Sequence, residues 1–276
     1  MLQASVRLLG VFICVSAFAQ VSQPVPEQIA PHWHGPIREK SEHRDGTTTS
    51  SNWSGYAATG TGFTSAYGTW VVPTVECGGV SANQYASSWV GIDGYSSSSV
   101  EQLGTDSDCV GSQSSYYAWY EFYPAPSYLI PLTIHSGDVI TASVIYNSAN
   151  GQFTITLTDQ TTPGTFTKSA SVSRAQRSSA EWILESPCCI KGGSLPFPNF
   201  GTAYFGPATT RMGNDSAGAT SLSGVISAFA PNYWLIQKTA SSTSPQTSTC
   251  TTLFSDGASF NCTYGAPASG GGHHNH

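Results

Sequence analysis

Acidic side chains recur at even spacing from aromatic or other acidic residues in three short segments of this sequence. Side chains two or four positions apart lie on the same face of a β-strand. Each segment therefore predicts a strand face on which carboxylates stand together or beside aromatic rings. Such a face suits hydrolysis by general acid and base catalysis, although a solvated sheet surface has the same pattern. The pairs are Trp89 with Asp93, Trp119 with Glu121, and Glu181 with Glu185.

Other common hydrolytic machineries lack the residues they need. Between residue 47 and the C-terminal tail the only imidazole is that of His135, and no GxSxG motif is present. The sequence contains no HExxH motif and no CxxC pair, which are typical of zinc sites. One Asp256-Gly257 pair does not supply the two motifs of an aspartic peptidase. Carboxylate or carboxamide chemistry remains, and we expect no metal and no cofactor.

Strands must position these side chains. Short runs that alternate with period two are separated by Gly, Pro, Asn and Ser, which is typical of antiparallel strands. The residues that favour helices, Glu, Lys, Arg and Met, are scarce. The sequence therefore predicts an all-β fold, with one β-sandwich or barrel domain. The clearest runs are residues 68–72, 87–92, 116–123, 139–146, 153–158, 180–185 and 233–237.

Composition excludes several classes of protein. The chain has 276 residues, of which 39% are hydrophobic and 9% charged, and its net charge is -6. This hydrophobic content supports a folded core and argues against a disordered chain. The basic residues form no run dense enough to follow a phosphate backbone, so we expect no nucleic-acid partner. No apolar stretch after the N-terminal segment is long enough to cross a bilayer, so we also expect no membrane partner, and a monomer.

The N-terminal 19 residues have the pattern of a signal peptide. Arg7 precedes an apolar run that ends in Ala17-Phe18-Ala19. This pattern predicts export to the extracellular space or the periplasm. At the other end, residues 270–276 form a Gly- and His-rich tail.

Residues 20–46 differ from the domain that we expect over residues 47–269. This leader contains four prolines together with basic residues and histidines. The domain that follows is acidic. Opposite charges favour an inhibitory pro-segment held against the domain partly by electrostatic attraction, and a flexible linker with incidental charges is the alternative. The basic residues of the leader are Arg38, Lys40 and Arg44, and its histidines are His32, His34 and His43.

Six cysteines remain after the signal segment, an even number that suits an oxidising compartment. Cys250 and Cys262 are close in sequence, and we expect them to form a disulfide bond. The adjacent Cys188 and Cys189 form either a vicinal bond or bonds to two different partners, and the sequence leaves this open.

Five motifs follow one another in an order that resembles the glutamic peptidases, also called eqolisins, over about residues 50–238. The resemblance implies a concanavalin-like jelly roll, that is, a β-sandwich of two antiparallel sheets. It also implies a secreted zymogen and an acid endopeptidase of protein or peptide substrates that pepstatin does not inhibit. The motifs are SNWSG at 51–55, SWVGIDG at 88–94, QLG at 102–104, AWYEFYP at 118–124 and AEWILE at 180–185.

The resemblance implies that Gln102 and Glu185 are the catalytic residues. A glutamine amide accepts a hydrogen bond from water and donates one to an oxyanion, and a carboxylate moves the proton. A neutral partner also lets Glu185 stay ionised in moderate acid. We expect the substrate-binding groove to contain Trp53, Trp89, Asp93, Glu121 and Trp119.

The sequence departs from the family pattern at two places. Tyr117 stands where the family usually has an acid, four residues before Glu121, and residues 96–99 are all serine and lack an expected cysteine. These differences affect the pH optimum and the subsite preference more than the reaction class.

Two other functions fit the same residues. A concanavalin-like glycoside hydrolase would use Glu121 and Glu185 as its acid and base, with sugars stacked on Trp89 and Trp119. A secreted carbohydrate-binding module would bind a ligand and turn over nothing.

Overall fold

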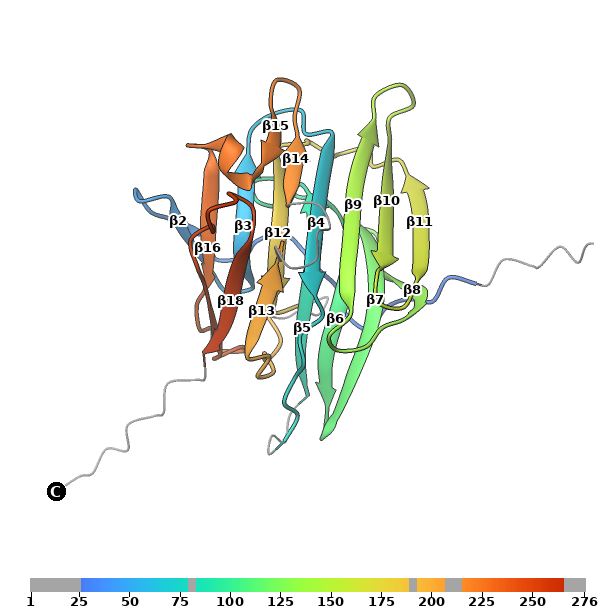
Figure 1. Ribbon diagram of the computed structural model, residues 1–276, viewed down its shortest axis with the longest axis vertical. Coiled ribbons are helices and arrows are strands. Elements are labelled where there is room, and N and C mark those ends of the chain that lie inside the picture. The colour runs from blue at the N-terminus through green and yellow to red at the C-terminus, as the bar shows by residue number, and fades with distance from the viewer. Residues whose placement is uncertain (1–25, 79–82, 189–192, 207–214, 266–276) are drawn as a thin grey trace, which may run out of the picture.

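The computed structural model describes residues 26–78, 83–188, 193–206 and 215–265. Within these ranges the chain forms antiparallel strands in two packed layers (Figure 1), which confirms the all-β sandwich. The expected signal peptide and the tail at 270–276 lie outside the described residues. The described part contains a short 3-10 helix, η2 (Ile226–Phe229), and no helix long and apolar enough to span a membrane.

The first sheet carries the segments singled out in the sequence. Its neighbouring strands pair antiparallel, except that β16 and β2 run parallel. The strands in spatial order are β1 (Ser41–Glu42), β2 (Thr47–Ser50), β16 (Tyr233–Lys238), β3 (Trp53–Thr59), β12 (Ser179–Glu185), β5 (Gln84–Ile92), β6 (Val100–Val110), β7 (Gln113–Tyr123) and β8 (Tyr128–Thr133).

The second sheet covers one face of the first. A small hairpin, β14 (Ser216–Gly218) with β15 (Ser223–Val225), pairs with the start of its central strand β4. The two sheets are joined at one edge, where Lys238 of β16 pairs with Ser248 of β17. The order is β17 (Thr247–Cys250), β18 (Phe260–Gly265), β13 (Thr202–Phe205), β4 (Ser65–Val71), β9 (Val139–Asn147), β10 (Gln152–Asp159) and β11 (Gly164–Ala170).

The hydrophobic core lies between the two sheets and follows from strand alternation. In β12, Trp182 and Leu184 point into this core, whereas Ile183 belongs to a separate apolar cluster on the outer face of the first sheet. In β10 the residues that alternate with the core side chains are threonines, and they bond across to β11, as Thr154 does to Ser169 at 2.8 Å. The core face is apolar in both sheets, which is why the sandwich closes.

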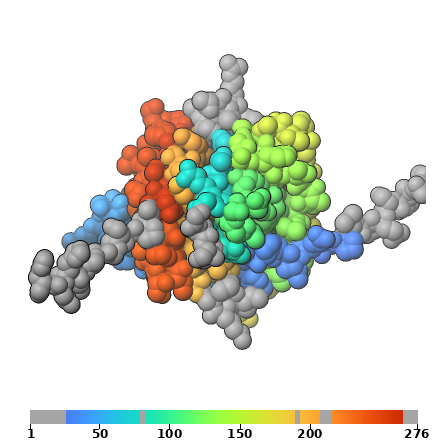
Figure 2. Space-filling model, turned by 90° about the horizontal axis from the view of Figure 1, so that it is seen from below, coloured from blue at the N-terminus to red at the C-terminus, as the bar shows by residue number. Residues whose placement is uncertain are grey.

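The outer face of the first sheet is also buried, because the leader lies on it. The leader enters beside β8, where Ile29 forms a bridge with Tyr128, and it ends at the β1–β2 pair on the opposite edge. Figure 2 shows its first part as a dark blue band against the green strands. The described part of the leader is thus packed against the domain and is not a detached linker. The face beneath it is formed by Trp53, Ala57, Trp89, Val100, Trp119, Ile183 and Ile236.

Two disulfide bonds are present among the described residues. Cys250 and Cys262 are opposite each other on β17 and β18 and are bonded, which confirms the expected pair. Cys77 is bonded to Cys109 at the end of β6. The Sγ atom of Cys188 accepts a hydrogen bond from Arg38 Nη2 at 3.3 Å, and Cys189 lies outside the described residues.

Candidate active site

Gln102 and Glu185 lie on strands that flank β5 on either side. Gln102 is opposite Gly91 of β5 on one side and Glu121 of β7 on the other. A Cβ atom at Gly91 would lie 3.2 Å from Cβ of Gln102 and 3.0 Å from the Trp89 ring, so glycine leaves room for both side chains. Glycine at position 91 of β5 therefore leaves the space that the Gln102 side chain occupies.

The amide group of Gln102 is buried and mostly bonded. Its Nε2 donates to Glu121 Oε2 at 2.9 Å and to the backbone carbonyl oxygen of His34 in the leader. Its Oε1 has no hydrogen-bond partner among the described groups. The side chain thus presents a donor to a peptide carbonyl and keeps an acceptor free for a water molecule.

Glu185 is held by two donors at the end of β12. Trp89 Nε1 donates to its Oε2 at 2.9 Å, and Asn52 Nδ2 donates to its Oε1 at 3.3 Å. The Trp53 ring contacts the Trp89 ring edge to face, with 5.0 Å between centroids. Burial raises the pKa of Glu185 well above its usual value, although both donors favour the charged form. Glu185 is therefore less easily ionised in acid than the sequence suggested, since the leader shuts it off from water.

Glu121 lies between Gln102 and the leader. Its Oε2 accepts hydrogen bonds from Gln102 and, at 3.1 Å, from the backbone N–H of His34. Burial raises its pKa well above the usual value, and the nearby charge of Glu185 raises it further. The two glutamates thus disfavour each other's ionisation, so one of them retains a proton over a wide pH range.

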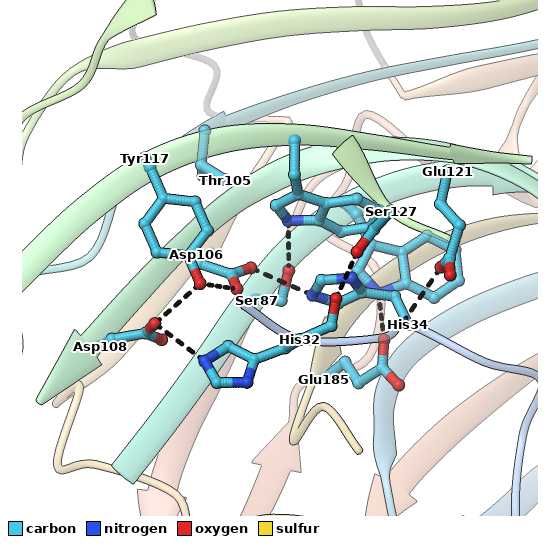
Figure 3. A network of polar contacts seen from close by, with 12 residues as sticks. His32, His34, Ser87, Thr105, Asp106, Asp108, Tyr117, Glu121, Ser127 and Glu185 are labelled. Atoms are coloured by element: carbon cyan, nitrogen blue, oxygen red, sulfur yellow. Dashed lines mark hydrogen bonds and ion pairs between the residues drawn. The ribbon is translucent and has the colours of Figure 1, made fainter. Parts of the chain in front are cut away.

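A second polar group extends along β6 and meets the leader's histidines (Figure 3). His34 Nε2 lies 3.2 Å from Asp106 Oδ1, and His32 Nε2 lies 3.3 Å from Asp108 Oδ2. Tyr117 Oη lies 2.8 Å from Asp106 and 2.9 Å from Asp108. A hydroxyl has one proton to donate, so these two short contacts fit best when one of the aspartates carries a proton.

The pKa values of the two aspartates diverge. Burial raises the pKa of Asp108 to about 6. Burial also acts to raise the pKa of Asp106, but the charge of His34 and its hydrogen bond outweigh it and hold the pKa below its usual value. Asp108 is thus the group of this pair that takes up a proton first in weak acid.

The ligand atoms of His32, Asp106 and Asp108 lie within 4.8 Å of one another, close enough to hold a metal ion. All three already have hydrogen-bond or ion-pair partners in the cluster around Tyr117. Asp108 Oδ1 and His34 Nδ1 nevertheless have no hydrogen-bond partner among the described groups.

The structure brings most of the predicted groove residues together, with one exception. Trp89 and Glu121 bond to the two predicted catalytic side chains, and the Trp119 ring lies under His34. Asp93 instead accepts hydrogen bonds from the backbone N–H groups of residues 176–178 and from Ser178 Oγ. Asp93 therefore holds a loop beside the site and has no hydrogen bond to Gln102 or Glu185.

Sequence reasoning missed Asn52 and Asp106. Asn52 lies within the quoted SNWSG motif, but nothing in the sequence indicates that its amide reaches β12. Asp106 is four positions after Gln102, so strand alternation puts both on one face. Recognition of residues 100–110 as a strand would therefore have predicted that Asp106 lies on the same face as Gln102.

The two-sheet β-sandwich is the fold of solved glutamic peptidases. Comparison with known proteins gives the same class. The sequence profile of the peptidase A4 family matches residues 51–254. The chain therefore belongs to the peptidase A4 family.

Relatives in sequence and structure are peptidases. Aspergillopepsin-2 of Aspergillus niger is 33% identical over 200 residues, which cover 63% of this chain and 70% of that protein. Scytalidopepsin B of Scytalidium lignicola is 35% identical over 167 residues, which cover 58% of this chain and 61% of that protein. The crystal structure of scytalido-glutamic peptidase with a peptide based transition state analog has a TM-score of 0.61 and 28% identity, covering 78% of this chain and 98% of that one. An eqolisin, SCP-B, in complex with the tripeptide Ala-Ile-His has a TM-score of 0.58 and 27% identity, with the same coverage.

Proposed function

We propose that this protein is an exported acid endopeptidase in which Gln102 and Glu185 hydrolyse peptide bonds without a metal. One observation carries the proposal. The Gln102 amide donates to a backbone carbonyl oxygen of a peptide segment that crosses the site beside Glu185. That donor is where an oxyanion would form if the carbonyl carbon were attacked by water.

The reaction follows from the donors and acceptors present. Glu185, as carboxylate, takes a proton from water, and the oxygen of that water attacks the carbonyl carbon. Gln102 stabilises the resulting oxyanion through Nε2 and orients the water through Oε1. Glu185 then returns the proton to the leaving nitrogen. Pepstatin should not inhibit this reaction, because no pair of aspartates performs it.

Peptide substrates fit both the family and the site. Two of the similar structures contain a peptide based transition state analog and a tripeptide. Here the backbone N–H and carbonyl groups of the leader form hydrogen bonds with the site, and a substrate peptide has the same backbone groups. Family membership and this peptide contact favour peptide-bond hydrolysis over the two carbohydrate-directed alternatives.

The leader makes this chain a precursor in our proposal. It covers the outer face of the first sheet and occupies the donors of both Gln102 and Asn52. A substrate cannot reach these groups while the leader stays in place. The full chain is therefore latent, and it becomes active when the leader is displaced or cut.

The test is hydrolysis of a denatured protein between about pH 2 and 7 with pepstatin and EDTA present. After acid treatment the wild type should be active, and Gln102→Ala and Glu185→Gln should each lose at least about a hundredfold in kcat. Glu181→Gln is the matched control, because Glu181 lies on the same face of β12 but about 13 Å along the strand from Glu185. Full activity of Gln102→Ala or Glu185→Gln would refute the dyad.

A further inference from the structure

Backbone hydrogen bonds hold the leader against the domain at two isolated bridges, Ile29 with Tyr128 and Trp33 with Cys188. On one side Ala30 N–H donates to the Ser127 carbonyl at 2.9 Å, and Leu129 N–H donates to the Gln28 carbonyl at 2.8 Å. On the other side Trp33 and Cys188 exchange both backbone hydrogen bonds, at 3.2 and 3.0 Å. Backbone pairing is a common way in which proteins hold a peptide segment. The two bridges thus fix the position of the leader on either side of residues 30–32.

The leader places the carbonyl group of one peptide bond against the Gln102 amide. The carbonyl oxygen of His34 accepts from Gln102, and the carbonyl oxygen of Pro36 accepts from Asn52 Nδ2 at 3.3 Å. The same Asn52 amide donates to Glu185. The bond from His34 to Gly35 therefore lies between the group that would hold its oxyanion and the group that would move its proton.

The His34 side chain fills a pocket that suits an imidazole. Its ring is stacked on the Trp119 ring at 3.5 Å with 3° between the planes, and its Nε2 meets Asp106. The side chain is fully buried. A flat ring with an N–H at its edge satisfies both the aromatic surface and the carboxylate, whereas an aliphatic side chain would leave Asp106 without this partner.

Gly35, the next residue, has room for a small side chain. A Cβ atom at Gly35 would lie 3.7 Å from the Tyr123 ring, which is ordinary contact. A small side chain therefore fits at the position after the histidine.

We propose that the His34–Gly35 bond is the bond at which this protein first cuts itself, and that Asp106 and Trp119 select an imidazole on the amino side of the cut bond. This inference rests on the proposed function. The oxygen of water bonds to the carbonyl carbon of His34 and the C–N bond to Gly35 breaks. One water proton passes through Glu185 to the Gly35 nitrogen, so the products are a carboxylic acid at His34 and an amine at Gly35. Each half of the leader then keeps only part of its hydrogen bonds.

The test follows the full chain in acid by intact mass and N-terminal sequencing. The first new N-terminus should be Gly35, with a complementary fragment that ends at His34, and Glu185→Gln should give neither. His34→Ala should slow formation of the Gly35 terminus at least about tenfold, because it loses a charge-assisted hydrogen bond and a stacked ring. His43→Ala is the matched control, since His43 is an exposed histidine of the same leader, and its rate should match the wild type.

Added peptides test the pocket independently of the leader. A peptide with the sequence of residues 29–38 should be cut after its histidine at position 34, at least about tenfold faster than the same peptide with leucine there. Asp106→Asn keeps the size of the side chain but removes its charge, so the ratio of the rates for the histidine and leucine peptides should fall.

The experiments distinguish a failure of the self-cleavage proposal from a failure of the proposed peptidase function. If wild type digests denatured protein but first cuts itself at another bond, or not at all, the self-cleavage site is refuted and the peptidase proposal survives. Equal rates for the histidine and leucine peptides refute the pocket. If wild type hydrolyses neither protein nor peptide in acid, the proposed function itself has failed.

Discussion

At the scale of single residues, the environment of Glu185 decides how the site works. Burial raises its pKa, while Trp89 and Asn52 stabilise its charged form by hydrogen bonds. Because these influences oppose one another, removing either donor should change the pH dependence of the reaction and not only its rate.

Asn52→Ala tests this balance. The variant loses the donor to Glu185, so the pKa of Glu185 should rise and the acidic limb of kcat/KM should move to higher pH. We also expect kcat to fall about tenfold, since Glu185 is less firmly oriented. Steady-state kinetics of the acid-treated enzyme over pH measures both effects. Asn150→Ala, in an exposed turn, is the control, and an Asn52→Ala profile that overlays the wild type would contradict this role.

The residue scale also shows the limit of sequence reasoning. Alternation correctly put Trp119 and Glu121 on one face, because that rule depends only on strand geometry. The same rule grouped Trp89 with Asp93, but Asp93 follows the end of β5 and has a positive φ of 72°, so alternation no longer applies there. The contact of Asn52 with Glu185 joins residues 133 positions apart, and no local pattern contains it.

At the scale of elements, β6 is a strand that alternation and residue propensity did not indicate. Its residues Val100–Val110 read VEQLGTDSDCV, with few β-branched or aromatic side chains. Ten of the eleven are nevertheless buried, because β5 and β7 flank it and the leader covers its polar face. The buried polar residues that weaken the strand signal are the ones that line the candidate site.

The leader is the other element for which sequence reasoning gave only part of the answer. Charge complementarity predicted attraction to the domain through Arg38, Lys40 and Arg44. In the structure the buried contacts are those of His32 and His34 with the aspartates of β6, and burial lowers the pKa of His34. Lys40 pairs within the leader, with Glu42 at 2.9 Å. Histidine suits this place because its short ring can be buried, whereas lysine keeps its amine in water.

Acid should loosen the leader. Asp108 takes up a proton as the pH falls through about 6, and its ion pair with His32 is then lost. Asp106 and Tyr117 also face this group, and Asp106, whose pKa is lowered, remains charged until stronger acid. The attraction between His32 and Asp108 is thus greatest between the pKa of Asp108, about 6, and the raised pKa of His32, and it weakens as the pH falls below about 6.

Hydrogen exchange of the inactive Glu185→Gln protein tests this release. The protection factors of residues 26–46 should fall as the pH drops from 7 to about 5, while those of β10 stay unchanged. In Asp108→Asn, protection of the leader should already be low at pH 7. A leader that stays equally protected at both pH values would contradict the release.

At the scale of the whole molecule, several carboxyl groups of the domain are buried, and burial raises their pKa values. The carboxyl group of Glu101 is buried, and burial, together with the charge of Asp93, raises its pKa to about 9, although a contact with Ser99 opposes the rise. Burial also raises the pKa values of Glu181 and Asp215 well above their usual range. Groups with raised pKa values favour the folded state most below the unfolded pKa, near 4.5 for glutamate, and this stability is lost as the pH rises toward the folded pKa.

Glu101→Gln should therefore flatten the dependence of stability on pH. The difference in free energy of unfolding between pH 4 and pH 8 should shrink by at least about 1.4 kcal/mol, the equivalent of one pKa unit. Urea unfolding at the two pH values measures it, and Glu76→Gln, at an exposed glutamate, is the control. An unchanged difference would show that Glu101 is not held neutral by burial.

The most direct test of the catalytic pair is a double-mutant comparison in acid, with one peptide substrate and leader-displaced protein. We expect Gln102→Ala and Glu185→Gln each to lower kcat at least about a hundredfold. Because the two residues act on the same water and carbonyl, the double variant should be little worse than the poorer single one. Losses that multiply in the double variant, or a single variant with full activity, would contradict the account.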